Sequence, residues 1–188
     1  MGSDTPSLDE FTRKQIAVFD ALSTKIQEAF DHKIIRHLCN TAAVERFPEA
    51  QYDMVRLGIG LYGIRSIDNF FINHVCTLKT TILQIHNLKA GETVGYGRKG
   101  VLTQNSKIAV LPIGYADGLA RAVGNGNAKC LVNGQLAPYI GNICMDVCMI
   151  DVTGVECKAG DTVIIFGEQL PITQLSECIG TIHYEILT

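Results

Sequence analysis

The 188-residue sequence lacks any run of lysine and arginine, and its net charge of −3 gives no electrostatic basis for binding nucleic acid. It also lacks a strongly apolar, charge-free stretch of about 18 residues, so no membrane-spanning helix is expected. The N-terminus is polar and does not resemble a signal peptide. With 47% hydrophobic residues, the chain can build a sizeable core in one or two domains.

Cysteine is present, but no Cys-x-x-Cys pair occurs among the seven cysteines. Structural zinc sites usually take their ligands from such closely spaced cysteine pairs, so no metal site is predicted. The cysteines are odd in number and mostly lie in apolar segments, where they resemble small buried hydrophobic residues. This usage favours the reducing cytoplasm over a disulfide framework.

Residues 1–65 show an alternation of helices and short strands. An amphipathic helix is predicted from about Ser7 to Phe30, and Ser7 and Glu10 have the spacing of a capping box. Short strands are predicted at 33–38 and 53–56, with a helix start near Asn40 between them. This order is typical of parallel α/β architecture, but two strands cannot bury both faces of such a sheet. We therefore interpret residues 1–65 as the end of a larger domain. The apolar stripe of the predicted helix consists of Leu8, Phe11, Val18, Leu22, Ile26 and Phe30.

Residues 66–188 show short apolar segments separated by glycine-containing turns. A long strand is predicted at 75–88 and another at 108–113, and Asn133-Gly134 is a strong hairpin signal. The pattern predicts an all-β barrel or sandwich, with one helix over 172–178. Shorter strands are predicted at 129–132, 136–140, 144–151 and 162–166.

The strand at 108–113 ends abruptly in Gly114-Tyr115-Ala116-Asp117-Gly118. The two glycines permit a tight turn, which would hold the Tyr115 phenol at the end of a rigid strand. This is a suitable way to present a catalytic hydroxyl. Tyrosines at strand ends are more often packing residues, so the pentapeptide alone does not decide between these interpretations.

Six short motifs follow one another along the chain. They are Tyr52-Asp-Met-Val-Arg56-Leu-Gly-Ile-Gly-Leu-Tyr62-Gly, Val94-Gly-Tyr96-Gly, Ile113-Gly-Tyr115-Ala-Asp117-Gly, Ile143-Cys-Met145-Asp146, Gly160-Asp161 and Gly180-Thr-Ile-His-Tyr184-Glu. Any one of these motifs is weak evidence, but six in order are specific. The same motifs occur in this order in alanine racemases, so from about Asp9 to Thr188 the sequence resembles that family.

The resemblance implies a (β/α)8 barrel that holds pyridoxal 5'-phosphate, followed by a β-domain, in a cytoplasmic homodimer that makes D-alanine from L-alanine for peptidoglycan. Residues 1–65 would be the last part of the barrel, and 66–188 a β-domain cut before its end. None of the nine lysines lies in the motif of the family's Schiff-base lysine. The chain is therefore expected to be an inactive C-terminal part of the enzyme. The extent of the match is also similar to racemases fused behind a D-alanyl-D-alanine-adding cell-wall ligase.

The resemblance also implies roles for single residues in cofactor binding. Arg56 matches the arginine that faces the pyridine nitrogen, and His37 matches a histidine that braces it. The phosphate would be held by the amides of Gly58 and Ile59 and by the Thr41 hydroxyl, as anions are held after the last strands of such barrels.

Three β-domain residues that match the family would serve the partner subunit's site. Tyr115 matches one of the two catalytic bases, and Met145 and Asp146 match residues near the substrate carboxylate. Tyr184 matches a tyrosine that contacts the phosphate and narrows the entrance. Tyr96 and Tyr139 are candidate entrance residues, with core packing as the alternative. The chain departs from the family at Gly141-Asn142, where Gly-Arg is usual, at His183, where Asn or Pro is common, and at Leu57, where proline is usual.

Two other functions compete with the racemase interpretation. A pyridoxal-phosphate amino-acid decarboxylase of the same two-domain design would carry a Gly-Pro-x-Cys-Asp run, which the segment from Gly141 to Asp146 does not match. A non-catalytic β-barrel interaction module is the other alternative, and the missing lysine favours it for this chain.

Overall fold

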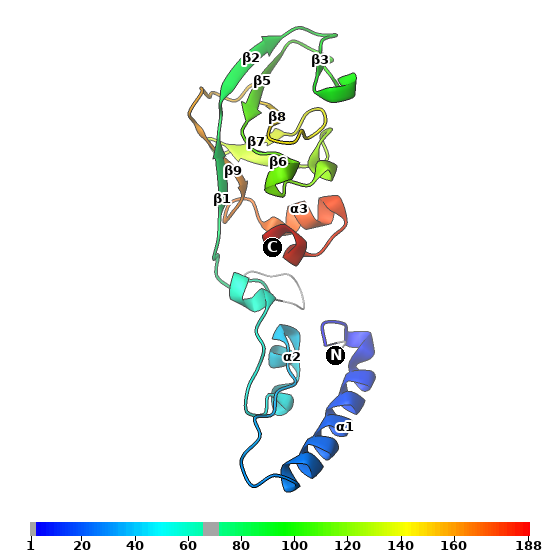
Figure 1. The fold of residues 1–188 in the computed structure, drawn as a ribbon. Helices are drawn as coiled ribbons and strands as arrows, with labels where there is room; N and C mark the ends of the chain where they lie inside the picture. The colour runs from blue at the N-terminus through cyan, green and yellow to red at the C-terminus, as the bar shows by residue number, and fades with distance from the viewer. Residues whose placement is uncertain (1–2, 66–71) are drawn as a thin grey trace. The chain divides into compact units, whose positions relative to one another are not determined.

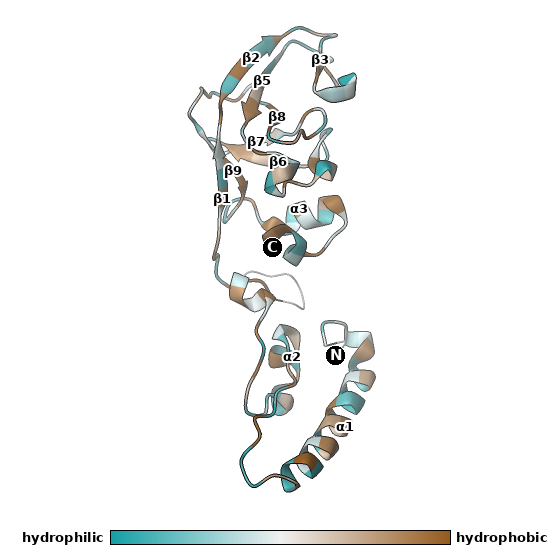
Figure 2. Ribbon diagram, viewed as in Figure 1, coloured by the Kyte–Doolittle hydropathy of each residue, from teal (hydrophilic) through white to brown (hydrophobic). Residues whose placement is uncertain are grey.

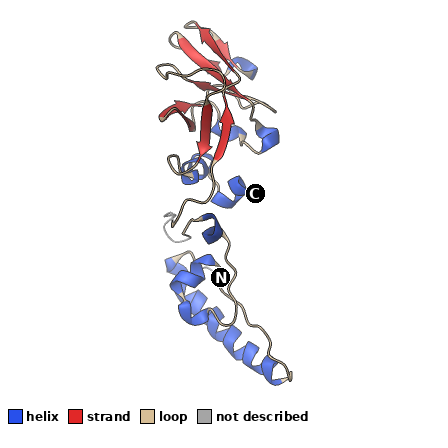
Figure 3. Ribbon diagram, turned by 90° about the vertical axis from the view of Figure 1, so that its left-hand side faces the viewer, coloured by secondary structure: helices blue, strands red, loops and turns tan. Residues whose placement is uncertain are grey.

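The computed structural model describes residues 3–65 and 72–188 and divides into two compact units, Met1–Val75 and Cys76–Thr188 (Figure 1). The first unit contains helices and short 3-10 turns, whereas strands dominate the second (Figure 3). The predicted mixed α/β class with a mostly β C-terminal part is confirmed. No closed barrel is present in the described residues.

The first unit begins with the 3-10 turn η1 (Pro6–Leu8), which leads into the helix α1 (Asp9–Glu28). The long helix was predicted correctly, but the capping box was not, because no side chain caps either element. Proline at position 6 has a backbone angle suited to a helical turn, so Ser7 already lies inside η1 and its hydroxyl is not at a helix start. Asp9 and Glu10 instead place negative charge in the first turn of α1, where it is favourable.

A short helix, α2 (Thr41–Arg46), follows at the predicted place, because Asn40 caps it by accepting a hydrogen bond from the Ala43 amide at 3.1 Å. The 3-10 turns η2 (Pro48–Ala50) and η3 (Ile59–Tyr62) come next. The strands predicted at 33–38 and 53–56 were wrong, because these segments share only one isolated parallel bridge, His37 to Met54. Parallel pairing is sustained in sheets covered on both faces, and the described part of this unit contains no further strand to extend the ladder.

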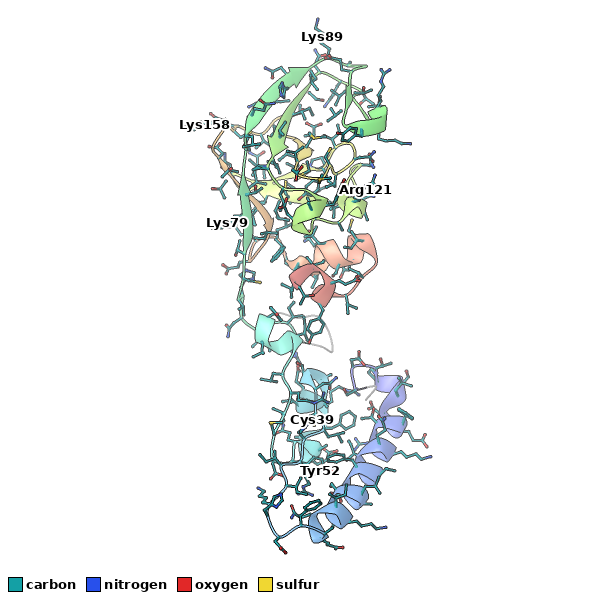
Figure 4. The ribbon with its side chains drawn as sticks, in the orientation of Figure 1. Cys39, Tyr52, Lys79, Lys89, Arg121 and Lys158 are labelled. Atoms are coloured by element: carbon teal, nitrogen blue, oxygen red, sulfur yellow. The ribbon has the colours of Figure 1, made fainter. Side chains whose placement is uncertain are left out.

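The core of the first unit lies around Phe47, which is buried together with Cys39, Ala43 and Ala50. Arg46 connects α2 to α1 by donating to both Asp9 carboxylate oxygens at 2.7 Å, and its guanidinium also lies over the Phe47 ring. Figure 4 labels Cys39 and Tyr52, which belong to the same packed region. Burial raises the pKa of the Cys39 thiol, so this cysteine is an inert core residue.

The predicted apolar stripe of α1 is exposed in the structure. Its six residues keep between 44% and 55% of their surface accessible, and Figure 2 shows the apolar and polar residues alternating along this helix. A different face of α1, with Thr12 and Ile16, packs on the core. Contiguous apolar surface of this kind is costly in water at about 25 cal/mol per Å², and it commonly marks an interface.

The second unit contains antiparallel sheets of four, three and two strands. Their strand orders are β1-β9-β6-β7, β2-β5-β8 and β3-β4. The strands are β1 (Leu78–Thr81), β2 (Gln84–Leu88), β3 (Thr93–Val94), β4 (Gly100–Val101), β5 (Ser106–Leu111), β6 (Lys129–Val132), β7 (Gln135–Pro138), β8 (Cys148–Asp151) and β9 (Thr162–Phe166).

The single strand predicted at 75–88 is two strands in two different sheets. β1 pairs with β9, and β2 pairs with β5. The change of partner occurs at Ile82, whose amide donates to the Asp161 carbonyl at 3.0 Å, and Leu83, whose amide donates to the Val110 carbonyl at 2.8 Å. The sequence of 75–88 does not indicate this change of partner, because both halves of the segment are equally suited to a strand.

Several local predictions in this unit are confirmed. Asn133 and Gly134 form the β6–β7 hairpin turn with positive φ angles of 47° and 78°, as a type I′ turn requires. The helix predicted at 172–178 is α3 (Ile172–Ile179), and it ends at Gly180 in the left-handed conformation. The strands expected at 136–140 and 144–151 correspond to β7 and β8, which are shorter than predicted. A further short helix, α4 (His183–Leu187), closes the described chain.

Candidate functional site

The turn after β5 is held in shape by its own backbone and by one aspartate. Tyr115–Asp117 form the 3-10 turn η5, and the Gly114 amide donates to Asp117 Oδ2 at 2.9 Å. Gly118 follows with a φ of +94°, a conformation that favours glycine. The sequence Gly-Tyr-Ala-Asp-Gly therefore specifies this turn locally, and the turn fixes the backbone that carries the Tyr115 phenol.

A second segment, at Cys144 and Met145, is joined directly to this turn. The Tyr115 amide donates to the Cys144 carbonyl and the Ala116 amide to the Met145 carbonyl, both at 3.0 Å. A Cβ atom added to Gly114 would lie only 2.2 Å from the Met145 carbonyl oxygen. Glycine is thus required at position 114, because the two segments approach more closely than any side chain allows.

Tyr115, Met145 and Asp146, three of the predicted site residues, line one groove of about 1050 Å³ in the second unit. Tyr115 is 45% exposed there, and Met145 and Asp146 are also exposed. Tyr96, 75% exposed, lines the same groove. The groove therefore brings together residues from the Tyr115 turn, from the segment at 144–146 and from the loop after β3.

Sequence reasoning missed two charged or titratable residues of this groove, Arg121 and His86. Arg121, labelled in Figure 4, lies in the 3-10 turn η6 (Arg121–Val123), shortly after the Tyr115 turn. Its position only three residues after Gly118 was the sequence signal that could have placed Arg121 near the Tyr115 turn. In the described residues its guanidinium makes no ion pair with a carboxylate, so it can meet an anion in the groove.

Tyr139, the other candidate entrance residue, is a core residue, so of its two possible roles the structure supports packing. It is 1% exposed, and its hydroxyl has no hydrogen-bond partner in the described structure. Burial raises the pKa of Tyr139 strongly, and burial likewise raises the pKa of Cys130 to about 12. Position 139 directly follows β7, and its backbone forms an antiparallel bridge with Ile150 of β8.

In the first unit, the hydroxyl of the buried residue Thr41 organises the backbone at the start of η3. Thr41 Oγ1 accepts hydrogen bonds from the Gly58 amide at 2.9 Å and the Gly60 amide at 3.4 Å. A Cβ on Gly60 would come within 2.9 Å of Thr41 Cγ2, so this backbone also approaches closely. The structure thus brings three predicted phosphate ligands, Thr41, Gly58 and Ile59, to one place, where amides and a hydroxyl gather at the start of a helical turn.

Arg56 lies just before that turn and donates to the Leu38 carbonyl at 3.1 Å. No carboxylate in the described residues pairs with it, which argues against the surface ion pair that was the alternative role. His37 is exposed beside Leu38, and its ring makes no hydrogen bond to Arg56 in the described structure. The guanidinium keeps donors available for a further acceptor.

Tyr184, the remaining predicted site residue, lies in α4 of the second unit and is 37% exposed. The preceding residue, His183, contacts α3 through a 2.7 Å hydrogen bond between its Nδ1 and the buried Ser176 hydroxyl. Burial lowers the pKa of His183, and the nearby Glu177 partly opposes this effect. The contact fixes the orientation of the short helix that carries Tyr184.

Two features are absent from the described residues. No helix there has the length and apolar character needed to cross a bilayer. No group of three or more His, Cys, Asp or Glu side chains in the described ranges is arranged to hold a metal ion.

Comparison with known proteins identifies relatives for both units. The family described as "Alanine racemase, C-terminal domain" matches residues 75–188, and "Alanine racemase, N-terminal domain" matches residues 2–66. The protein "Alanine racemase 1" of Clostridium acetobutylicum is 39% identical in an alignment of 188 residues. The alignment covers 95% of this chain and 48% of that protein.

Solved structures give the same result. An alanine racemase of Clostridium difficile 630 in complex with cycloserine has a TM-score of 0.89 at 35% identity, covering 98% of this chain and 50% of that one. The alanine racemase of Bartonella henselae with covalently bound pyridoxal phosphate has a TM-score of 0.82 at 29% identity, covering 94% and 48%. The chain thus spans about half the length of these relatives. The ordered motifs, the two domain matches and these relatives together show that the chain belongs to the alanine racemase family.

Proposed function

We propose that this chain supplies the C-terminal half of a pyridoxal-phosphate-dependent alanine racemase, which interconverts L- and D-alanine, and that Tyr115 is one of its two catalytic acid–base groups. The observation that carries the proposal is the groove in which Tyr115, Met145 and Asp146 meet. The relatives are named alanine racemases, which supports the same reaction. None of the relatives described above is a decarboxylase.

Racemisation removes the α-proton from one face of the amino acid and returns a proton to the other, so it needs a proton-transfer group on each side. Tyr115 suits one of these positions because its turn is fixed by backbone hydrogen bonds while its side chain remains partly exposed. Met145, joined to the same turn, and Asp146 would lie beside the substrate carboxylate. Arg121 adds a cation to the groove that would attract that carboxylate.

The donors of the first unit fit pyridoxal phosphate. Thr41, Gly58 and Ile59 bring a hydroxyl and backbone amides to the start of a helical turn, and donors of this kind bind phosphate. The Gly58 amide, which donates to Thr41 in this structure, would then donate to the phosphate instead. Arg56, which has no acidic partner in the described residues, would donate to the pyridine nitrogen, and His37 would stand beside it. When bound, the cofactor supplies an electron-withdrawing ring that acidifies the α-proton. Because arginine stays protonated, Arg56 would hold the ring nitrogen without transferring a proton to it.

We propose further that the complete enzyme is a homodimer in which Tyr115 of one copy serves the cofactor held by the other, as in the family. Tyr184 would contact the phosphate, with its helix α4 positioned through His183 and Ser176. No lysine of this chain lies in the motif of the family's covalent lysine, so the 188-residue chain alone should neither bind the cofactor tightly nor racemise alanine.

The test is Tyr115→Phe in a complete racemase that contains this chain. The change keeps the ring and removes the proton-transfer group, so turnover should fall by about 10²–10⁴-fold, unequally in the two directions, while cofactor absorbance stays unchanged. Tyr139→Phe is the matched control, because it removes a buried hydroxyl without a partner in the described structure, and activity should be kept.

Mixing Tyr115→Phe with a variant that lacks the covalent lysine tests the shared site. A heterodimer would contain one intact lysine–tyrosine pair, so part of the activity should return. If Tyr115→Phe turns over alanine in both directions as fast as the unmodified enzyme, Tyr115 is not a catalytic acid–base group. If heterodimers form and no activity returns, the two groups do not share a site.

A further inference from the structure

The chain passes from one sheet of the second unit to another at Ile82. Thr81 is the last residue of β1 paired with β9, and Leu83 already donates to the Val110 carbonyl of β5. Ile82 belongs to neither β1 nor β2, and it is buried. Its backbone amide and carbonyl therefore need partners within the protein, because water does not reach them.

Both groups are bound by the loop 152–161, which connects β8 to β9. The Ile82 amide donates to the Asp161 carbonyl at 3.0 Å, and the Gly160 amide donates to the Ile82 carbonyl at 2.8 Å. Because β8 lies in the three-stranded sheet and β9 in the four-stranded sheet, this loop also crosses between the sheets. Two crossings of the chain are thus hydrogen-bonded to each other.

The Asp161 carboxylate holds the end of this loop in shape. Its Oδ2 accepts from the Lys158 amide at 3.0 Å and from Asn133 Nδ2 at 3.1 Å, and Asn133 Nδ2 also donates to the Glu156 carbonyl at 3.0 Å. These two contacts, that with Lys158 first, lower the pKa of Asp161, so the loop binds the ionised form. Asn133 belongs to the β6–β7 turn, so the carboxylate joins the loop to the four-stranded sheet.

The same loop is also joined to the three-stranded sheet. Lys107 of β5 donates from its Nζ to the Cys157 carbonyl at 3.0 Å. β5 pairs with β2, the strand that begins just after the crossing, and His86 and Leu88 of β2 line the Tyr115 groove. The loop therefore contacts both sheets at the point where the chain enters a wall of the groove.

We propose that Asp161 is a positioning residue: its carboxylate holds the loop so that the Gly160-Asp161 backbone fixes Ile82, and this places β2 as a wall of the Tyr115 groove. The Gly160-Asp161 motif has no part in the proposed racemase chemistry, and the positioning role accounts for it. This role is a property of the 188-residue chain, so its test does not depend on that chemistry.

Three variants of the 188-residue chain separate this role from a simple loss of charge. Asp161→Ala removes both contacts of the carboxylate, whereas Asp161→Asn keeps an oxygen acceptor and should restore most of the protection. Glu156→Ala is the matched control, because it removes one negative charge from the same loop. The Glu156 carboxylate makes no hydrogen bond or ion pair within the described part of the chain. Hydrogen exchange measured by NMR would follow the Ile82 and Gly160 amides, with the amides of β5 and β8 as the reference for the whole unit.

Asp161→Ala should speed exchange at Ile82 and Gly160 by about three- to thirtyfold relative to the reference amides, the range for losing one or two hydrogen bonds. Glu156→Ala should change it by less than about twofold. If Asp161→Ala does not fold, Asn133→Gly removes one of the two contacts, tolerates the φ of +47°, and should speed exchange by about twofold or more. Equal acceleration throughout β5 and β8, or unchanged exchange at Ile82, would overturn the proposal.

The placement of β2 is measured separately, from the ring of His86 in the groove. The NMR signals of this ring should shift or broaden in Asp161→Ala and return toward their original positions in Asp161→Asn. They should stay unchanged in Glu156→Ala, which controls for long-range effects of charge, and the ring signals of His183 in α4 should stay unchanged in every variant. Faster exchange at Ile82 with unchanged His86 signals would show that the crossing does not position the groove wall.

Discussion

Replacing Gly114 by alanine should detach the Tyr115 turn from the segment at Cys144 and Met145. The new Cβ would lie 2.2 Å from the Met145 carbonyl oxygen and 2.4 Å from that of Cys144, whereas real Cβ contacts are essentially never closer than 3.0 Å. Both contacts are with backbone, so no flexible side chain can move away. The φ of Gly114 is −146°, so the substitution adds no dihedral strain of its own.

The expected cost follows from two contributions. Separating the segments breaks the hydrogen bonds from the Tyr115 and Ala116 amides, each with a net value of about 0.5–1.5 kcal/mol. Forcing an extra methyl into a packed contact costs about 1–3 kcal/mol more. The free energy of unfolding of the second unit should therefore fall by about 2–6 kcal/mol.

Gly118→Ala is the matched control in the same turn. A Cβ there would meet nothing within 4 Å, but the φ is +94°, so only backbone strain of about 1–2 kcal/mol is expected. Urea unfolding should be read by pulsed hydrogen exchange on peptides from β5 and β8, so that the second unit is followed separately. At a slope of about 2 kcal/mol per molar urea, Gly114→Ala should lower the midpoint by roughly 1–3 M, clearly more than Gly118→Ala. If the two variants are equally stable, the close approach at Gly114 is not a constraint on this fold.

Two further predictions concern other parts of the chain. Because burial lowers the pKa of His183 below 6.5, the unfolded chain takes up this proton at higher pH than the folded chain. The stability that depends on neutral His183 is thus present above about pH 6.5 and lost as the pH falls toward the folded pKa. The thermal midpoint should fall over this range in the parent and less in His183→Asn, and parallel curves would contradict this. Because the stripe of α1 is exposed, dilute trypsin should cleave the first unit before the second, whereas equal protection of both units in a monomer would refute this.

Features that depend on a few adjacent residues could be predicted from the sequence. The Asn133-Gly134 hairpin, the Asn40 cap of α2 and the Tyr115 turn each follow from local backbone chemistry, and all three are present. The strands expected at 33–38 and 53–56 failed because regular pairing depends on neighbouring strands that the segments themselves do not specify. The capping box failed because Pro6 began the helical backbone before Ser7.

Side-chain environments depend on contacts between distant segments, and here the sequence was less informative. Tyr96 and Tyr139 were equivalent candidates, yet one lines the groove and the other is buried, because their positions relative to the strands differ. Gly141-Asn142 was noted only as a departure from the family, and the hydrogen bonds of the Asn142 side chain with the Tyr96 carbonyl and with Asn125 could not be inferred without the fold. The proximity of Tyr115 to Met145 likewise depends on the close backbone approach at Gly114, where an added Cβ would lie 2.2 Å from the Met145 carbonyl oxygen. No local sequence pattern encodes this approach.

The pairing of β1 with β9 has a consequence for synthesis on the ribosome. β1 begins at Leu78, but its partner ends at Phe166, so most of the second unit must be translated before this edge can be covered. Meanwhile β2, which follows β1 almost directly, can already pair with β5. Such long-range closure slows folding and leaves an unpaired edge on the nascent chain. The four-stranded sheet is therefore the part of this unit most exposed to wrong pairing during synthesis.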